Sequence, residues 1–293
     1  MFSGSMVALV TPMHRDGMVD LQALRKLIEF HIQAGTDGLV IAGTTGESAT
    51  LTKTEHAELI FQSVEIAAGR IPVIAGTGSN STAQTLELSK TVEDSGAKAL
   101  LVVTPYYNKP TQEGLYRHFS TIADSVAVPL VLYNVPGRTG CDMLPTTVAR
   151  LALHPNIVGV KEAAGQVARY SELVDLCQGN IDVFSGDDAT NLEFFRCGAK
   201  GVISVTANVA PRRMHKVCAA ALAGDFETAE AINSELVDLH RLLFIESNPI
   251  PVKWAIHKMG LAEEGIRLPL TVLSSAGQQA LLPALIKAGV VKQ

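Results

Sequence analysis

Short runs of apolar residues alternate along the chain with longer stretches whose apolar positions follow a helical spacing. Each run is about four to six residues long and almost uninterrupted, which is typical of strands buried on both faces of a parallel sheet. The eight runs that we expect to form strands are Met6–Val10, Gly38–Ala42, Pro72–Gly76, Ala99–Val103, Leu130–Tyr133, Ile157–Lys161, Val183–Ser185 and Gly201–Val205.

Signals for helix ends lie between these runs. A capping box, in which the first residue and the residue three positions later satisfy each other's exposed amides, is predicted at Thr52–Glu55 and at Ser81–Gln84. Glycines follow several helical stretches, at the point where a left-handed residue is favoured. These glycines are Gly35, Gly69, Gly96 and Gly198.

The repetition of strand and helix predicts an α/β fold of the (β/α)8 TIM-barrel type, with additional C-terminal helices. The alternative is an open, doubly wound sheet, which usually carries a Gly-x-Gly-x-x-Gly turn after its first strand. Residues 11–14 occupy that place and read Thr-Pro-Met-His, whereas the nearest imitation, at residues 76–81, lacks the third glycine.

About 85 residues follow the eighth run, which is more than one helix requires. Residues 211–224 suit the eighth barrel helix, and we expect added helices over residues 226–244, 252–260 and 276–288. No linker rich in glycine, serine or charge separates them from the barrel. We therefore expect residues 1–224 to form the catalytic barrel and residues 225–293 a helical extension packed on it.

Composition narrows the classes of function. The chain has 293 residues, of which 47% are hydrophobic, so general disorder is excluded. A net charge of −5 gives no support to nucleic-acid or membrane binding. No apolar run approaches the roughly 18 residues of a membrane span, and the N-terminus lacks the basic segment of a signal peptide. We expect a cytoplasmic protein.

Metal chemistry has little support in the sequence. The four cysteines, Cys141, Cys177, Cys197 and Cys218, are scattered and read as reduced thiols. The eight histidines show no His-Glu-x-x-His spacing. We expect neither a metal nor a cofactor.

Candidate chemistry gathers where the expected strands end, which is the catalytic rim of such barrels. Lys161 ends the sixth run, and residues 157–160 would bury its stem. Desolvation there favours the neutral amine, which attacks a carbonyl to form a Schiff base. The alternative is a structural lysine paired with Glu162 or Glu47.

Three further features of the same rim fit that chemistry. Tyr133 ends the neighbouring strand and could move protons to and from Lys161, although a core tyrosine bonded to the backbone is an alternative. Arg138 offers a planar fork for a carboxylate, or is simply a solvated charge. The Gly43–Gly46 loop could hold a small anion with amides and two hydroxyls, or is a plain turn. Together they indicate an aldolase acting on an α-keto acid.

Longer motifs carry a family resemblance. The chain resembles the dihydrodipicolinate synthase / N-acetylneuraminate lyase family of class I aldolases, from Met1 almost to the C-terminus. The motifs are residues 38–47 (GLVIAGTTGE), 133–136 (YNVP) with 161–163 (KEA), 103–108, 185–188, 201–205 and 248–253.

The resemblance implies an activity. The most similar branch of the family condenses pyruvate with L-aspartate 4-semialdehyde to give 4-hydroxy-2,3,4,5-tetrahydrodipicolinate, on the way to diaminopimelate and lysine. Another pyruvate-dependent aldolase, such as an N-acetylneuraminate lyase, is the alternative within the family. Those lyases usually have an apolar residue where this chain has Arg138. A barrel that only binds an effector is the alternative outside enzymes.

The resemblance also implies catalytic roles. Lys161 would form the imine with pyruvate, and Tyr133 would act as the general acid and base. Thr44 and Tyr107 would complete a proton relay with Tyr133, and in the family the tyrosine at the position of Tyr107 reaches across a dimer interface. A homotetramer built from tight dimers is implied in the same way.

Binding and regulatory residues follow from the same resemblance. Thr45, Gly186 and the backbone at Ile203 would hold pyruvate, and Arg138 would bind the carboxylate of the semialdehyde. Ala164 stands where a hydroxyl residue is common, and we do not expect it to abolish activity. Residues resembling the family's site for L-lysine inhibition are Ser48, Ala49, His56, Asn80 and Tyr106.

That inhibitory site departs from the family pattern at two positions. Lys53 stands where sensitive enzymes commonly have histidine, and Gln84 where they commonly have glutamate. Loss of a carboxylate and gain of a cation weaken the capture of a cationic ligand. We expect weak or absent inhibition by L-lysine.

Overall fold

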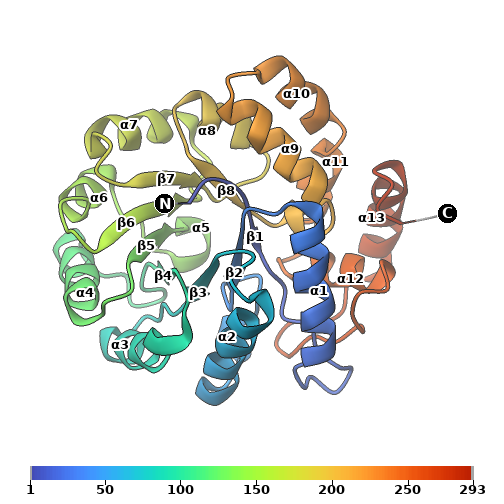
Figure 1. Cartoon of the computed structure of the whole chain (residues 1–293), viewed down its shortest axis with the longest axis horizontal. Coiled ribbons are helices and arrows are strands. Elements are labelled where there is room, and N and C mark those ends of the chain that lie inside the picture. The colour runs from blue at the N-terminus through green and yellow to red at the C-terminus, as the bar shows by residue number, and fades with distance from the viewer. Residues whose placement is uncertain (1, 292–293) are drawn as a thin grey trace.

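Eight parallel strands close into a barrel in the computed structural model, which describes residues 2–291 (Figure 1). Each strand pairs with its neighbours in the sequence, and β8 pairs with β1. The prediction of a (β/α)8 barrel is confirmed, and every observed strand overlaps its expected run. The strands are β1 (Gly4–Ala8), β2 (Gly38–Ile41), β3 (Val73–Gly76), β4 (Ala99–Val103), β5 (Leu130–Asn134), β6 (Ile157–Glu162), β7 (Asp182–Ser185) and β8 (Gly201–Ser204).

Helices surround this barrel (Figure 1). Short 3-10 turns, η1 (Ser48–Thr50), η2 (Glu93–Ser95) and η3 (Thr206–Asn208), complete the connections. Among the described residues 2–291, no helix combines the length and the apolar character that crossing a bilayer requires. The helices up to residue 222 are α1 (Leu21–Ala34), α2 (Lys53–Ala67), α3 (Thr82–Thr91), α4 (Gln112–Ser125), α5 (Pro136–Thr139), α6 (Pro145–Leu151), α7 (Val167–Cys177), α8 (Asn191–Arg196) and α9 (Pro211–Leu222).

Helix ends agree with the sequence signals at most positions. The capping box at Thr52–Glu55 is confirmed, and the four predicted glycines all have positive φ angles. The prediction of a second capping box, at Ser81–Gln84, is wrong for one of its two hydrogen bonds. The Ser81 hydroxyl accepts from the Gln84 amide, but the Gln84 side chain accepts from the Ser79 hydroxyl, and Ser79 also accepts from the Ser81 amide. A nearby serine thus competes for both groups.

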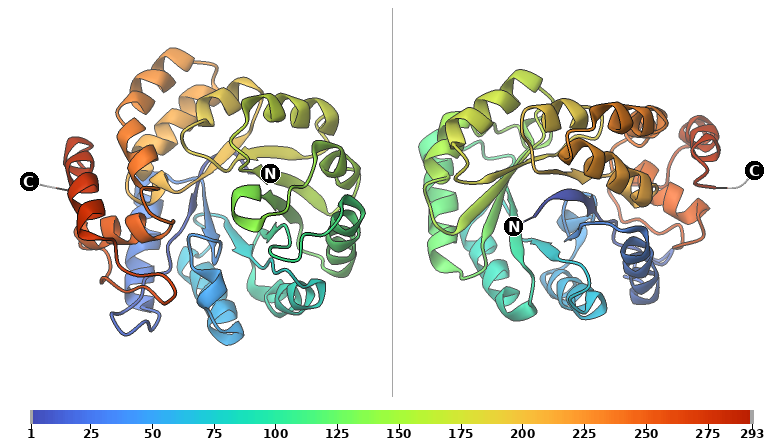
Figure 2. Two further views of the ribbon diagram at one scale, coloured as in Figure 1. Left: turned by 180° about the vertical axis from the view of Figure 1, so that it is seen from behind. Right: turned by 45° about the horizontal axis from the view of Figure 1, so that its top comes forward.

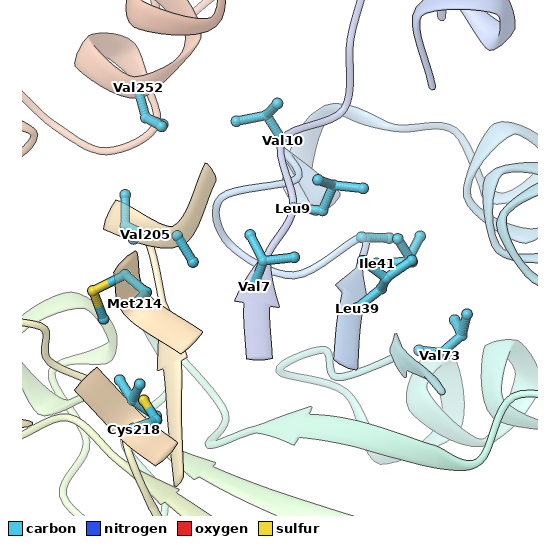
Figure 3. Close-up of a cluster of buried hydrophobic side chains, with 14 of the residues drawn as sticks. Val7, Leu9, Val10, Leu39, Ile41, Val73, Val205, Met214, Cys218 and Val252 are labelled. Carbon is cyan, nitrogen blue, oxygen red and sulfur yellow. The ribbon is translucent and has the colours of Figure 1, made fainter. Parts of the chain in front are cut away.

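Side chains on the strands alternate between two separate cores. One core fills the barrel and includes Met6, Val40 and Ile203. The other lies between strands and helices, and Figure 3 shows part of it, where Val7 of β1 lies between Leu39 of β2 and Met214 of α9. This period-two alternation decides which side chains can reach a substrate at the barrel mouth.

The segment expected as one helix over residues 226–244 is two helices, so that prediction is wrong. Helices α10 (Phe226–Ser234) and α11 (Val237–Leu242) are separated by a turn. The turn buries Leu236 completely, and it lets His240 bond the Thr206 hydroxyl of η3 at 2.9 Å. Tertiary contacts therefore outweigh helical continuity.

The last helices share the outer core of the barrel. They are α12 (Ile250–Lys258) and α13 (Ser275–Lys287), which lie on the α1 side of the molecule in Figures 1 and 2. Val252 of α12 belongs to the same buried cluster as Val10 and Val205 (Figure 3). This shared core supports an extension packed on the barrel, and the exact boundary at residue 224 stays a prediction.

Candidate active site

Lys161 and Tyr133 lie side by side inside the barrel. They are partners in the parallel register of β5 and β6, and each is only 6% exposed. The Lys161 Nζ atom lies 4.3 Å from the centre of the Tyr133 ring. The structure therefore brings together the amine and the phenol that the sequence singled out.

The carboxylates that could have paired with Lys161 have other partners. Glu162 accepts a charged hydrogen bond from Arg169, with Nε and Oε2 3.0 Å apart. Glu47 forms a buried ion pair with Lys253 of α12. The alternative of a structural lysine paired with Glu162 or Glu47 is therefore wrong.

Gly186, just after β7, makes room for the lysine stem. A Cβ atom at this position would lie 3.1 Å from the Lys161 Cε atom and 2.6 Å from the Ala163 Cβ atom. The Gly186 amide also donates to the Glu162 carbonyl at 2.7 Å. Ile203 of β8 is 1% exposed in the inner core. Both residues thus border the barrel interior, where the sequence predicted them.

Two adjoining cavities lie near Tyr133. The inner one, of about 30 Å³, is bordered by Tyr133 and Thr44. The outer one, of about 510 Å³, is bordered by Thr44, Arg138 and Asn248. Thr44 borders both cavities, so the outer cavity lies next to the one that Tyr133 borders. A volume of this size suits a small metabolite.

Asn248 is a site residue to which the sequence gave no role. Its side-chain amide donates to the Thr45 hydroxyl at 2.9 Å, and its backbone carbonyl accepts from Arg138 at 3.2 Å. The residue is buried, and its Oδ1 atom has no hydrogen-bond partner among the described residues. The segment before α12 therefore links the two residues expected to hold substrate carboxylates. Residues 248–253 belong to one of the motifs, which was the only available signal.

A second unpredicted contact holds the loop after β2. Glu47 has a positive φ of 57° and is buried, and Lys253 and the Arg267 amide both bond its carboxylate. Arg267 also binds Glu55 of α2 with two nitrogens. The helical extension thus fixes the loop that carries Thr44 at the cavity wall.

Tyr107 stands apart from the other predicted residues. Its side chain is 87% exposed, with a positive φ of 75°, and it is not among the described residues that border either cavity. Its amide donates to the Thr139 carbonyl at 3.2 Å, which fixes the loop. Within one chain, Tyr107 does not join the site.

Most residues of the expected L-lysine site border the outer cavity. Ser48, Ala49, His56 and Tyr106 do so, together with Lys53 and Gln84. Asn80 is not among them. Its backbone carbonyl accepts a hydrogen bond from the Asn108 side chain at 2.8 Å.

Two basic residues at this end of the cavity have partners of their own. Burial lowers the pKa of His56, whose Nε2 atom bonds the Gly76 carbonyl at 2.7 Å. Lys53 pairs with Glu87 at 2.5 Å. Within residues 2–291, no three His, Cys, Asp or Glu side chains gather in a way that could hold a metal ion.

Comparisons with known proteins agree over the whole chain. The model of the dihydrodipicolinate synthetase family matches residues 1–288. A relative from Methylococcus capsulatus named 4-hydroxy-tetrahydrodipicolinate synthase is 60% identical over 99% of this chain and 100% of its own length. A relative of the same name from Stutzerimonas stutzeri is 59% identical with the same coverage.

Solved structures show the same similarity. A chloride-inhibited dihydrodipicolinate synthase from Acinetobacter baumannii, complexed with pyruvate, is 54% identical with a TM-score of 0.98 and covers 99% of this chain and 100% of its own. A dihydrodipicolinate synthase from Cyanidioschyzon merolae with lysine bound is 38% identical with a TM-score of 0.96, covering 99% of both chains.

Proposed function

The chain belongs to the dihydrodipicolinate synthetase family, and we propose that it uses Lys161 to condense pyruvate with L-aspartate 4-semialdehyde. The product is 4-hydroxy-2,3,4,5-tetrahydrodipicolinate, an intermediate of diaminopimelate and lysine biosynthesis. The observation that carries the proposal is the buried amine of Lys161, 4.3 Å from the centre of the ring of Tyr133, which itself borders the inner cavity.

The reaction follows from the chemistry of that amine. Lys161 attacks the keto carbon of pyruvate, and loss of water leaves a protonated imine. The imine withdraws electrons, so the methyl group loses a proton and the resulting enamine attacks the aldehyde carbon. The amino group of the joined substrate then attacks the imine carbon, which closes the ring and releases Lys161.

Tyr133 is the general acid and base in these reaction steps. A phenol beside the amine can protonate the departing hydroxyl of the carbinolamine and take protons back. Thr44 borders the cavity beside Tyr133 and extends the relay toward the outside. No cofactor is needed, because the lysine itself supplies the electron-withdrawing group.

Carboxylate binding divides between two places. Thr45, Gly186 and the backbone at Ile203 hold pyruvate near Lys161, and the fork of Arg138 binds the carboxylate of the semialdehyde. The hydrogen bonds of Asn248 to Thr45 and Arg138 support this division, since they fix both groups relative to each other.

Tyr107 completes the relay from a second subunit. This proposal is supported by the exposure of its large ring, which lies outside the site of its own chain. We infer a dimer in which each Tyr107 enters the partner's site, and a homotetramer built from two such dimers in the cytoplasm. Mixing Lys161→Ala subunits with Tyr107→Phe subunits tests this, because restored activity requires exchange of residues between subunits.

L-lysine is at most a weak effector of this chain. The Cyanidioschyzon merolae enzyme carries bound lysine, so a barrel of this kind can accept it. Here Lys53 and Gln84 border the cavity, and a cationic ligand would meet an ammonium group and lack a carboxylate.

Turnover with defined substrates tests the activity. Purified protein should consume pyruvate and L-aspartate 4-semialdehyde together and should leave N-acetylneuraminate intact. Arg138 favours the first reaction, because it matches a short substrate with a carboxylate. Cleavage of N-acetylneuraminate without condensation of the semialdehyde would overturn the proposal in favour of a lyase.

A further inference from the structure

Asn134 and Glu162 are the residues that directly follow Tyr133 and Lys161. They are partners in the same parallel register, one step beyond the pair formed by Tyr133 and Lys161. Because side chains alternate along a strand, Asn134 and Glu162 point away from the barrel interior, toward the surrounding helices. The two reactive side chains therefore have a second pair of polar side chains directly behind them.

Glu162 is completely buried and fully engaged. Asn134 donates to both of its carboxylate oxygens, at 3.2 and 3.1 Å, and the Ala164 amide donates to Oε1 at 2.8 Å. Arg169 of α7 donates from Nε to Oε2 at 3.0 Å. Burial raises the pKa of Glu162, and Arg169 and these donors oppose that effect. Hydrogen bonds to a charged group in a dry environment hold their geometry tightly.

This cluster is anchored to elements outside the two strands. Arg169 holds Asp142 with two nitrogens, at 3.0 and 2.8 Å. The Asn134 side-chain oxygen Oδ1 accepts from the Met143 backbone amide at 3.0 Å, and its side-chain NH2 group also donates to Asp142 at 3.0 Å. The ends of β5 and β6 are thus tied to the 141–144 segment and to α7 through side chains.

We propose that Glu162 is a positioning residue that, through Asn134 and Arg169, fixes the ends of β5 and β6 and thereby the separation of Lys161 from Tyr133. Glu162 itself touches no substrate, since it lies on the far side of the strand. The separation matters because a misplacement of about 1 Å between reacting groups can cost on the order of 100-fold in rate. The inference rests on the proposed function, which assigns Lys161 and Tyr133 their chemistry.

Glu162→Gln is the informative substitution. It keeps the shape and one acceptor oxygen, but its amide group faces either Arg169 and Asn134 or Ala164 and Asn134, all of which are donors. We expect the saturating rate of imine formation with pyruvate, measured by borohydride quenching, to fall by about 10-fold. The pyruvate concentration for half-maximal rate should stay within about twofold, because the carboxylate-binding residues are untouched. Glu162→Asp, which restores both acceptors, should recover part of the rate.

Leu173→Ala is the matched control for lost stability. Leu173 is a fully buried apolar residue of the same helix α7, and its side chain has no polar atom to bond the cluster, so its truncation leaves a cavity and removes no hydrogen bond. This variant should unfold at a lower temperature and keep its saturating rate within about twofold of the unchanged protein.

Three results would overturn the inference. The first is an unchanged saturating rate in Glu162→Gln, and the second is an equal rate loss in Leu173→Ala. The third is a rise in half-maximal pyruvate concentration that accounts for the whole effect. If Glu162→Gln does not fold, a Glu162→Asp variant with the full wild-type rate and a disturbed Arg169 contact decides against it. Failure of the unchanged protein to form any adduct would instead refute the proposed function.

Discussion

The Lys161 amine faces the ring of Tyr133 at 4.3 Å, across two adjacent strands of the closed barrel. Both side chains are almost fully buried. Glu162 and Glu47, the two carboxylates considered as partners of Lys161, form ion pairs with other residues. The proposed nucleophile and the proposed proton carrier thus lie together, and Tyr133 borders a cavity.

Arg138→Ala should separate the two substrates. We expect imine formation with pyruvate to stay within about threefold, because Arg138 lies in the outer cavity, away from Lys161. Use of L-aspartate 4-semialdehyde should fall by about 100-fold or more in kcat/KM, as expected for loss of a charged hydrogen bond worth roughly 3 kcal/mol. Single-turnover trapping and steady-state kinetics measure the two effects. Equal loss in both would contradict the assigned role.

Sensitivity to L-lysine should depend on Lys53 and Gln84. Titration of the unchanged protein should show no strong inhibition at sub-millimolar L-lysine. The double variant Lys53→His with Gln84→Glu removes an ammonium group from the cavity wall and adds a carboxylate. It should bind L-lysine at least about 10-fold more tightly by calorimetry. Strong inhibition of the unchanged protein, or no gain in the double variant, would refute this explanation.

The buried pair of Lys253 and Glu47 should be costly to break. Burial lowers the pKa of Lys253, whereas Glu47 opposes that effect, so each group compensates the other. Lys253→Met leaves a buried carboxylate without its cation and should lower the free energy of unfolding by about 3–5 kcal/mol. Adding Glu47→Gln to Lys253→Met should restore part of the lost free energy of unfolding.

An exposed pair provides the control for that experiment. Arg70 and Glu29 pair at the surface, where solvent screens their charges, so Arg70→Met should cost much less stability than Lys253→Met. Denaturant titration compares the variants. A loss in Lys253→Met no larger than in Arg70→Met would show that burial of the Lys253 pair contributes little.

His31 should make the fold sensitive to acid. It is completely buried, and burial lowers its pKa from 6.5 to about 3. The unfolded chain therefore binds a proton that the folded chain resists, and stability is lost as the pH falls from 6.5 toward 3. One such group contributes a slope of about 1.4 kcal/mol per pH unit in that window.

The variant His31→Leu tests this slope. It loses the hydrogen bond between Nδ1 and the Thr36 hydroxyl at 2.9 Å, so it should be less stable than the unchanged protein at pH 7. The gap between the two proteins should then shrink as the pH falls from 6.5 to 4. The free energy of unfolding is measured by urea titration at each pH. Parallel curves for the two proteins over this range would contradict the assigned role of His31.

The barrel and the central pair could be predicted because their signals are local. Eight apolar runs mark the strands, and a parallel register brings strand ends to one rim, so Lys161 and Tyr133 had to lie near each other. Gly186 and Thr44 follow strand ends in the same way. The break between α10 and α11 could not be predicted, because it depends on the contact of His240 with Thr206 in another element.

Partners distant in the sequence were also beyond prediction. Glu47 and Lys253 are 206 positions apart, and Asn248 meets Thr45 across 203 positions. Which of several cations pairs with Glu162 depends on how α7 packs, and from the sequence we considered Lys161 and not Arg169 for that pair. Spacing along the chain does not indicate which distant residues meet. The chemical types of the residues indicate only which pairs could interact.

Reductive trapping of pyruvate tests the central claim most directly. The protein is incubated with pyruvate, reduced with borohydride, digested and analysed by mass spectrometry. A single pyruvate-derived adduct on Lys161 is predicted, with none on Lys253, the other buried lysine within residues 2–291, and none in a Lys161→Ala variant. An adduct elsewhere, or full condensation activity in Lys161→Ala, would contradict the account.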